Sequence, residues 1–164
     1  MLHFAKVGEH PRGTLCQLLQ DAYAFEPRYE KDWLARWQEE MDFFYLHPQI
    51  ADSCCFVTEL DGEAIGFVCW DPRNLPDFVE LGHNCIVTHC KGRGYGKLQL
   101  QEALRRIAMT NPKEIRVTTD EILIPAQKNY ESCGFQFLRF RENSWNASYA
   151  GKLMDYRMVL FDSQ

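Results

Sequence analysis

The sequence of 164 residues lacks any hydrophobic run long enough to cross a membrane. A membrane-spanning helix needs about 20 mainly apolar residues, and no apolar stretch here approaches that length. The N-terminus also lacks the basic segment followed by an apolar core that a secretory signal requires. We therefore expect a soluble, cytoplasmic protein without a membrane partner.

Excess positive charge and closely spaced cysteines are also missing. Lys and Arg number 18 against 23 Asp and Glu, so the net charge of -5 has the wrong sign for a protein that neutralises nucleic-acid phosphates. The seven cysteines include no Cys-x-x-Cys pair, and the spacing from Cys85 to Cys90 is too long for a zinc knuckle. We expect no nucleic-acid partner and no metal, and we interpret the cysteines as reduced core thiols.

No low-complexity segment, internal repeat or shift in composition divides the sequence. Apolar residues make up 46% and charged residues 25%, as in ordinary globular proteins. A chain of this length corresponds to one domain of normal size. We therefore predict a single domain over residues 1–164 and exclude disordered and fibrous classes.

The N-terminal half is predicted to contain a strand, two helices and a β-hairpin. Apolar side chains recur at helical spacing in both helices, and Asp61-Gly62 favours a tight hairpin turn. The predicted bounds are 2–7 for the strand, about 15–23 and 29–45 for the helices, and 54–60 and 64–70 for the hairpin strands.

The C-terminal half is predicted to alternate strands with helices. Asn111-Pro112 ends the first of these helices, while Pro125 begins the second and Gly134 ends it. The predicted strands are 77–87, with Gly82 inside it as a candidate bulge, then 115–119, 135–140 and 153–161.

Three alternating glycines stand at a strand-to-helix junction, in the loop 91–97 (Lys-Gly-Arg-Gly-Tyr-Gly-Lys). Such a loop lets backbone N–H groups close on an anion at the positive end of a helix, which predicts a phosphate-bearing ligand. A nucleotide-hydrolase P-loop would need glycine in place of Lys91 and Ser or Thr in place of Leu98. The dinucleotide fingerprint would need glycine at Lys97 or Gln99, so both of these loops are excluded.

The remaining pattern resembles the acetyl-CoA loop of the GNAT family of N-acetyltransferases, (Arg/Gln)-x-x-Gly-x-(Gly/Ala) after an apolar strand. Here it is Lys91-x-x-Gly94-x-Gly96. Lys91 stands where Arg or Gln is commoner, and Thr88 stands where many members have proline. Neither departure removes the backbone donors.

The segment Ala126-x-x-x-Tyr130-x-x-x-Gly134-Phe135 resembles a second motif of the same family, and the order of predicted elements agrees from residue 1 to 161. The resemblance implies an α/β fold with a mixed, mainly antiparallel sheet, flanked by helices and splayed where acetyl-CoA enters. It also implies transfer of an acetyl group from acetyl-CoA to an amine of a small molecule or peptide, by direct attack in a ternary complex. The residues it assigns to acetyl-CoA are Ile86, Val87, Thr88, Lys91, Gly92, Arg93, Gly94, Tyr95, Gly96 and Lys97.

Transfer to an amine requires a neutral amine, a polarised carbonyl and a proton for the departing thiolate. The resemblance places Tyr130 beside the coenzyme A sulfur, which makes it the candidate acid. Glu80 is the candidate base, because some members carry a glutamate in the corresponding strand that relays the amine proton through water. His83, Asp120 and bulk water remain alternatives to Glu80.

Two other functions and several details stay open at this stage. The chain could be a non-catalytic acyl-CoA-binding or sensor module, or an interaction protein that uses its C-terminal strands. The second predicted helix carries aromatic residues typical of core packing, and its acidic residues favour either a cationic acceptor or a solvated face. These acidic residues are Glu30, Asp32, Glu39, Glu40 and Asp42. The length of the acyl donor and a homodimeric state are also undecided.

Overall fold

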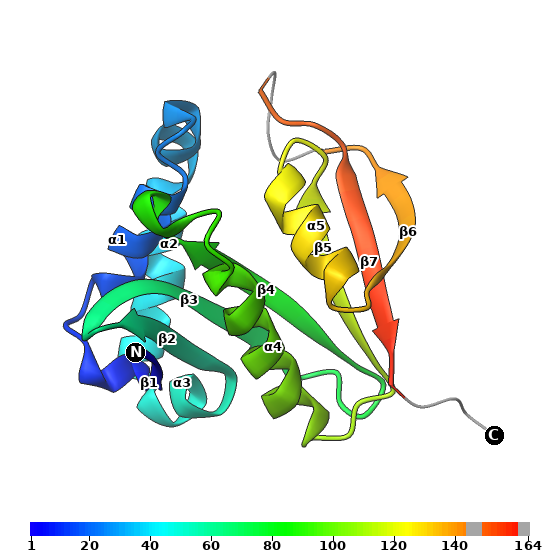
Figure 1. Ribbon diagram of the computed structural model, residues 1–164, viewed down its shortest axis with the longest axis horizontal. Helices are drawn as coiled ribbons and strands as arrows, with labels where there is room; N and C mark the ends of the chain where they lie inside the picture. The colour runs from blue at the N-terminus through cyan, green and yellow to red at the C-terminus, as the bar shows by residue number, and fades with distance from the viewer. Residues whose placement is uncertain (144–148, 161–164) are drawn as a thin grey trace. The chain divides into compact units, whose positions relative to one another are not determined.

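The computed structural model describes residues 1–143 and 149–160. Within them the chain forms a seven-stranded sheet and five α-helices (Figure 1). The strands are β1 (Leu2–Ala5), β2 (Cys55–Leu60), β3 (Glu63–Asp71), β4 (Phe78–Ile86), β5 (Glu114–Asp120), β6 (Gln136–Arg141) and β7 (Leu153–Val159). The helices are α1 (Thr14–Ala22), α2 (Pro27–Leu46), α3 (Pro48–Cys54), α4 (Tyr95–Ala108) and α5 (Ile124–Ser132), with 3-10 turns η1 (Val7–Glu9) and η2 (Thr88–Cys90).

The strand order is β1-β2-β3-β4-β5-β7-β6, with β4 and β5 parallel. The pairs β1–β2, β2–β3, β5–β7 and β6–β7 are antiparallel. The predicted α/β fold with a mixed, mainly antiparallel sheet is therefore confirmed. No helix among the described residues combines the length and the apolar character that a membrane span requires.

Several predicted boundaries shift, and one helix was not predicted. Pro27 is the first residue of α2 instead of a break before it, and the Glu26 side chain accepts a hydrogen bond from the Arg28 N–H at that end. Residues 48–54 form α3, so the prediction that Cys54 begins a hairpin strand is wrong. The predicted end of the last strand at Phe161 lies outside the described residues.

The chain divides into two compact units. The first unit comprises residues 1–69 and 83–99, and the second comprises 70–82 and 100–164. Strands β3 and β4 and helix α4 contribute residues to both units. In the first unit α1 buries Leu15, Leu18 and Leu19, and α1 packs against α2.

A buried amide holds the start of α4 in the first unit. Gln99 is fully buried, and its side-chain oxygen accepts a hydrogen bond from the Thr58 hydroxyl at 2.7 Å. Its nitrogen donates to the Asn84 side chain at 2.7 Å and to the Phe67 carbonyl at 2.9 Å. Because these partners lie on β2, β3 and β4, the network fixes the N-terminal part of α4 against three strands.

The core of the second unit lies between α5 and the sheet. Figure 1 shows α5 alongside β5 and β7. Tyr130 on α5 contacts Tyr156 on β7, with ring centroids 6.0 Å apart, and both side chains are buried. Ile115 and Val117 of β5 are buried as well.

The seven cysteines are all free thiols, and six of them are buried. Cys55 on β2 lies directly opposite Cys69 on β3. Burial raises the pKa of Cys69 and of Cys85 to about 12. Six of the seven cysteines are therefore core thiols as predicted, while Cys133 is partly exposed.

Candidate functional site

The glycine loop takes a backbone conformation that favours glycine. Gly92 and Gly94 have φ angles of 77° and 87°. A Cβ atom at either position would meet nothing within 4 Å, so backbone conformation and not packing selects glycine there. The loop surface is consequently open at these two positions.

The same loop presents backbone N–H donors at the start of a helix. The Leu98 N–H donates to the Gly94 carbonyl at 3.2 Å and begins the ladder of α4. The N–H groups of Tyr95, Gly96 and Lys97 precede this bond and belong to the first turn, where an α-helix supplies no acceptor. Since the helix dipole is positive at this end and the loop contains no acidic residue, the loop fits a pyrophosphate group.

Two residues at the entrance of the loop use their polar groups to anchor it. The Lys91 ammonium donates to the Ala22 carbonyl at 2.5 Å and lies 5.0 Å from the centre of the Phe25 ring. Burial lowers the pKa of Lys91. Thr88 bonds to Asp21 through both its N–H, at 2.7 Å, and its hydroxyl, at 2.9 Å. Their role in coenzyme binding stays a prediction, but both tie the loop to the end of α1.

The strand that leads to the loop is only partly paired with β5. Only Phe78–Glu80 of β4 pair with β5, at Glu114–Arg116. Both strands continue past this paired segment, β4 to Ile86 and β5 to Asp120. The side chains of Ile86 and Val87 are buried, and the Val87 N–H donates to the Ile65 carbonyl at 2.8 Å. A strand edge that its neighbour leaves unpaired can pair with an extended ligand.

The three candidate bases differ in how far their side chains are already engaged. Asp120 is buried, and one of its oxygens accepts from the N–H groups of Ile122 and Gly151 at 3.0 Å each. His83 Nε2 lies 3.4 Å from a Glu40 oxygen, and this contact lowers the pKa of Glu40.

Glu80 is exposed and sits opposite Arg116 in the β4–β5 register. No hydrogen bond or ion pair joins its carboxylate to another residue in the described part of the chain. Of the three candidate bases, Glu80 is therefore the one with an exposed side chain and no hydrogen-bonded partner among the described residues.

The tyrosine motif forms the end of α5 as predicted. The Phe135 N–H donates to the Tyr130 carbonyl at 3.0 Å, and the Gly134 N–H donates to the Glu131 carbonyl at 3.1 Å. Gly134 has a φ of 102°, so this is a Schellman cap that requires a residue tolerant of the left-handed conformation. The spacing from Tyr130 to Gly-Phe thus has a structural reason, while the catalytic role of Tyr130 remains a prediction.

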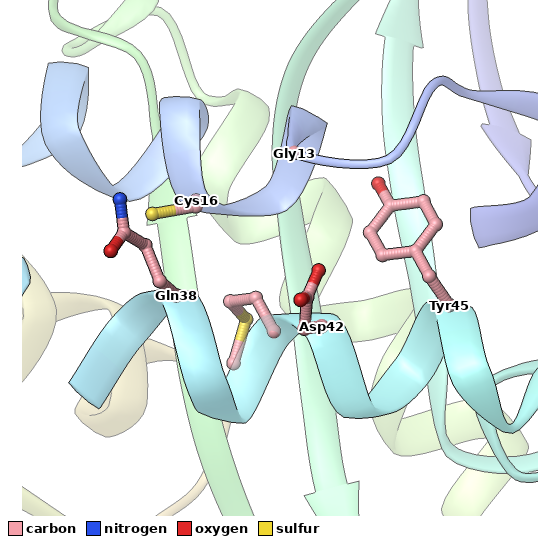
Figure 2. Close-up of a pocket in the computed structure, with 6 residues that line it drawn as sticks. Gly13, Cys16, Gln38, Asp42 and Tyr45 are labelled. Atoms are coloured by element: carbon pink, nitrogen blue, oxygen red, sulfur yellow. The ribbon is translucent and has the colours of Figure 1, made fainter. Parts of the chain in front are cut away.

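A pocket of about 320 Å³ lies between α1 and α2 in the first unit. Figure 2 shows the side chains of Cys16, Gln38, Asp42 and Tyr45 at this pocket. Burial raises the pKa of Tyr45. Asp42 is already paired with Arg12, at 2.6 and 2.8 Å, so the pocket offers no unpaired charge to a ligand.

Comparisons with known proteins agree with the resemblance found in the sequence. Residues 16–135 match the acetyltransferase (GNAT) family. The N-acetylaspartate synthetase of Danio rerio is 27% identical over 97 residues, which cover 59% of this chain and 34% of that protein. The human N-acetylaspartate synthetase is 26% identical over 99 residues, which cover 60% of this chain and 32% of that protein. The matched segment thus spans about a third of the length of these relatives.

Two solved structures show the same fold at low sequence identity. The ribosomal-protein-S18-alanine N-acetyltransferase from Escherichia coli is similar with a TM-score of 0.74 and 14% identity, over 100% of this chain and 97% of that one. A GNAT family acetyltransferase from Elizabethkingia anophelis with acetyl-CoA bound is similar with a TM-score of 0.64 and 16% identity. The similarity covers 98% of this chain and 97% of that one.

Proposed function

The chain belongs to the acetyltransferase (GNAT) family, and we propose that it is an acetyl-CoA-dependent N-acyltransferase that acetylates an amine of a small molecule or peptide by direct attack in a ternary complex. We also propose that residues 1–164 make up one N-acetyltransferase domain. The observation that carries the proposal is the open glycine loop at the start of α4.

In this proposal the loop binds the pyrophosphate of acetyl-CoA through the backbone N–H groups of residues 92–97. Arg93 and Lys97 are exposed and add positive charge. The pantetheine arm pairs with the end of β4, near Ile86 and Val87. Support comes from the first-turn N–H groups, for which α4 itself supplies no acceptor, and from the short β4–β5 register.

The chemical step needs one base and one acid. Glu80, acting through water, takes a proton from the acceptor ammonium, and the neutral nitrogen attacks the thioester carbonyl. The tetrahedral intermediate then breaks its C–S bond, and Tyr130 donates its hydroxyl proton to the departing thiolate. The extra proton that the nitrogen still carries passes to the tyrosinate, which yields the neutral amide and restores the Tyr130 hydroxyl. The open carboxylate of Glu80 and the fully engaged carboxylate of Asp120 favour this choice of base.

Thiol release from acetyl-CoA, measured with a panel of amines, tests the proposal. The panel includes aspartate, because the relatives named above are N-acetylaspartate synthetases. We expect release that depends on the amine. Binding of acetyl-CoA without release by any amine would instead support the non-catalytic sensor.

A further inference from the structure

One face of the sheet in the second unit carries four arginines beside Glu80. The register places Glu80 on β4, Arg116 on β5 and Arg157 on β7 side by side. In the next row Arg139 on β6 lies opposite Asp155 on β7, and Arg141 reaches back to the same carboxylate. We call Arg116, Arg139, Arg141 and Arg157 the arginine face.

Two carboxylates on this face are each shared by two arginines. Asp155 accepts from Arg139 at 2.8 Å and from Arg141 at 2.7 and 2.8 Å. One carboxylate oxygen of Glu114 lies 2.5 Å from a guanidinium nitrogen of Arg116, and the other lies 3.9 Å from a guanidinium nitrogen of Arg157. A guanidinium group has five N–H donors, so donors outnumber these acceptors. The four side chains are between 42% and 66% exposed, which leaves donors open to a ligand.

Arg116 is held in a defined orientation. Its guanidinium carbon lies 3.8 Å from the centre of the Phe78 ring, on the neighbouring strand. Stacking of this kind fixes the plane of the guanidinium group and leaves its edge available. Glu80 follows Phe78 by two residues on the same face of β4 and is directly opposite Arg116, at the roughly 5 Å spacing of neighbouring strands.

The Glu80 carboxylate and the exposed guanidinium groups of the arginine face together are complementary to a ligand that carries one positive and one negative group. A purely cationic acceptor would meet repulsion from the arginine face. Of the five acidic residues of α2, Asp42 is paired with Arg12, and Glu40 is paired with Arg36 and His83. These pairs weaken the case for a cationic acceptor.

We propose that the acceptor is an amine that also carries a carboxylate, such as a dicarboxylic amino acid, and that Arg116 and Arg141 bind this carboxylate while Glu80 receives the ammonium proton. The inference rests on the proposed function and specifies its substrate class. It makes Arg116 and Arg141 the residues that determine specificity.

The first test compares acceptors that differ only in one carboxylate. Aspartate and asparagine form one matched pair, and glutamate and glutamine form another. We expect kcat/KM to be at least tenfold higher for the carboxylate member of a pair, because a bidentate charge-assisted contact is lost in the amide. If turnover is measurable but kcat/KM is about equal for the carboxylate and the amide member of each pair, the inference is overturned and the proposed function stands. Absence of turnover with every amine contradicts the proposed function itself.

The second test changes the arginines. Arg116→Gln should reduce the aspartate-to-asparagine ratio by about ten- to a hundredfold, and Arg116→Lys by less, because lysine keeps the charge and loses the bidentate geometry. The matched control is Arg105→Gln on α4, where the arginine is also exposed and ion-paired with its neighbour Glu102. It should leave the ratio unchanged.

The ratio separates recognition from structural damage. Arg141→Gln also removes donors from Asp155, so Arg116→Gln, which does not touch that carboxylate, decides the outcome. Equal losses for both acceptors, or an unchanged ratio in Arg116→Gln, overturn the inference. Saturable binding of an RNA or an acidic protein to the arginine face, with no preference between the amino acids, would overturn it as well.

Discussion

At the residue scale, the proposed anion site depends on Gly94. Its φ of 87° places the residue in the left-handed region at the start of α4. Gly94→Asp adds a side chain and a negative charge where phosphates would lie, so we expect affinity for coenzyme A to fall at least a hundredfold. Isothermal titration calorimetry measures the change.

Gly62→Asp is the control for backbone strain. Gly62 has a φ of 86° in the β2–β3 turn, and a Cβ atom there also meets open space. This variant should bind coenzyme A like the wild type. If folded Gly94→Asp keeps wild-type affinity, the loop is not the pyrophosphate site.

Removal of the Tyr130 hydroxyl tests the proposed acid. Tyr130→Phe should lower kcat by about 10- to 1,000-fold while the Kd for acetyl-CoA barely changes, because the hydroxyl acts on the departing thiolate. Tyr156→Phe is the control, since that hydroxyl is also buried but donates to Glu131 at 2.9 Å. Steady-state kinetics with equal kcat in wild type and Tyr130→Phe would leave water as the proton donor.

The pH profile tests Glu80 as the base. An ordinary amine with a pKa near ~10 is protonated at neutral pH, so loss of the base slows the reaction most at low pH. Glu80→Gln should therefore lower kcat/KM at neutral pH, and kcat/KM of the variant should recover as the pH approaches the amine's own pKa. His83→Gln serves for comparison, and a profile that changes only in this variant transfers the role to His83.

At the scale of secondary-structure elements, Asp155 joins β5, β6 and β7 through Thr118, Arg139 and Arg141. The Arg141 contact is the main reason why the pKa of Asp155 is lowered to about 2. A depressed carboxylate pKa means that the contribution to stability is present above the ordinary value of 3.8 and is lost as pH falls through about 2.

We therefore expect Asp155→Asn to lower the free energy of unfolding by on the order of 2 kcal/mol at pH 7. The difference between wild type and variant should shrink between pH 4 and pH 2. Urea unfolding of both proteins across this range checks the sign. A difference that grows on acidification would contradict the role of Asp155.

Local signals made most elements predictable, and long-range contacts explain what was missed. Gly134 marks the C-terminal end of α5, and Asp61-Gly62 marks the turn between β2 and β3; both are visible in the sequence as short local motifs. Helix α3 has only seven residues, about two turns, which is too short for apolar periodicity to stand out, and Pro48 was its one local sign.

The missed residues of the candidate site depend on strand register. Gln99 shares the buried side of α4 with Ala103, four residues on, but its partners lie on β2, β3 and β4. Arg116 becomes a neighbour of Glu80 only when β4 and β5 pair. Alternation along β5 could show that Arg116 is exposed, but it could not show which strand lies beside it.

For the whole molecule, coenzyme binding should appear as thermal stabilisation. A ligand at 100 times its Kd stabilises the folded state by about 2.7 kcal/mol, which for a chain of this size raises Tm by roughly 5–10 °C. Coenzyme A should produce such a shift in differential scanning fluorimetry. Pantetheine, which lacks the pyrophosphate, should produce far less, and equal shifts would contradict a site based on the glycine loop.

The burial of the cysteines decides how turnover can be recorded. Disulfide reagents react with the thiolate form of a thiol, and they must reach it. Among the seven cysteines, all within the described residues, Cys133 alone is partly exposed. A chromogenic disulfide such as Ellman's reagent should therefore titrate about one protein thiol quickly and then report coenzyme A continuously against a flat baseline.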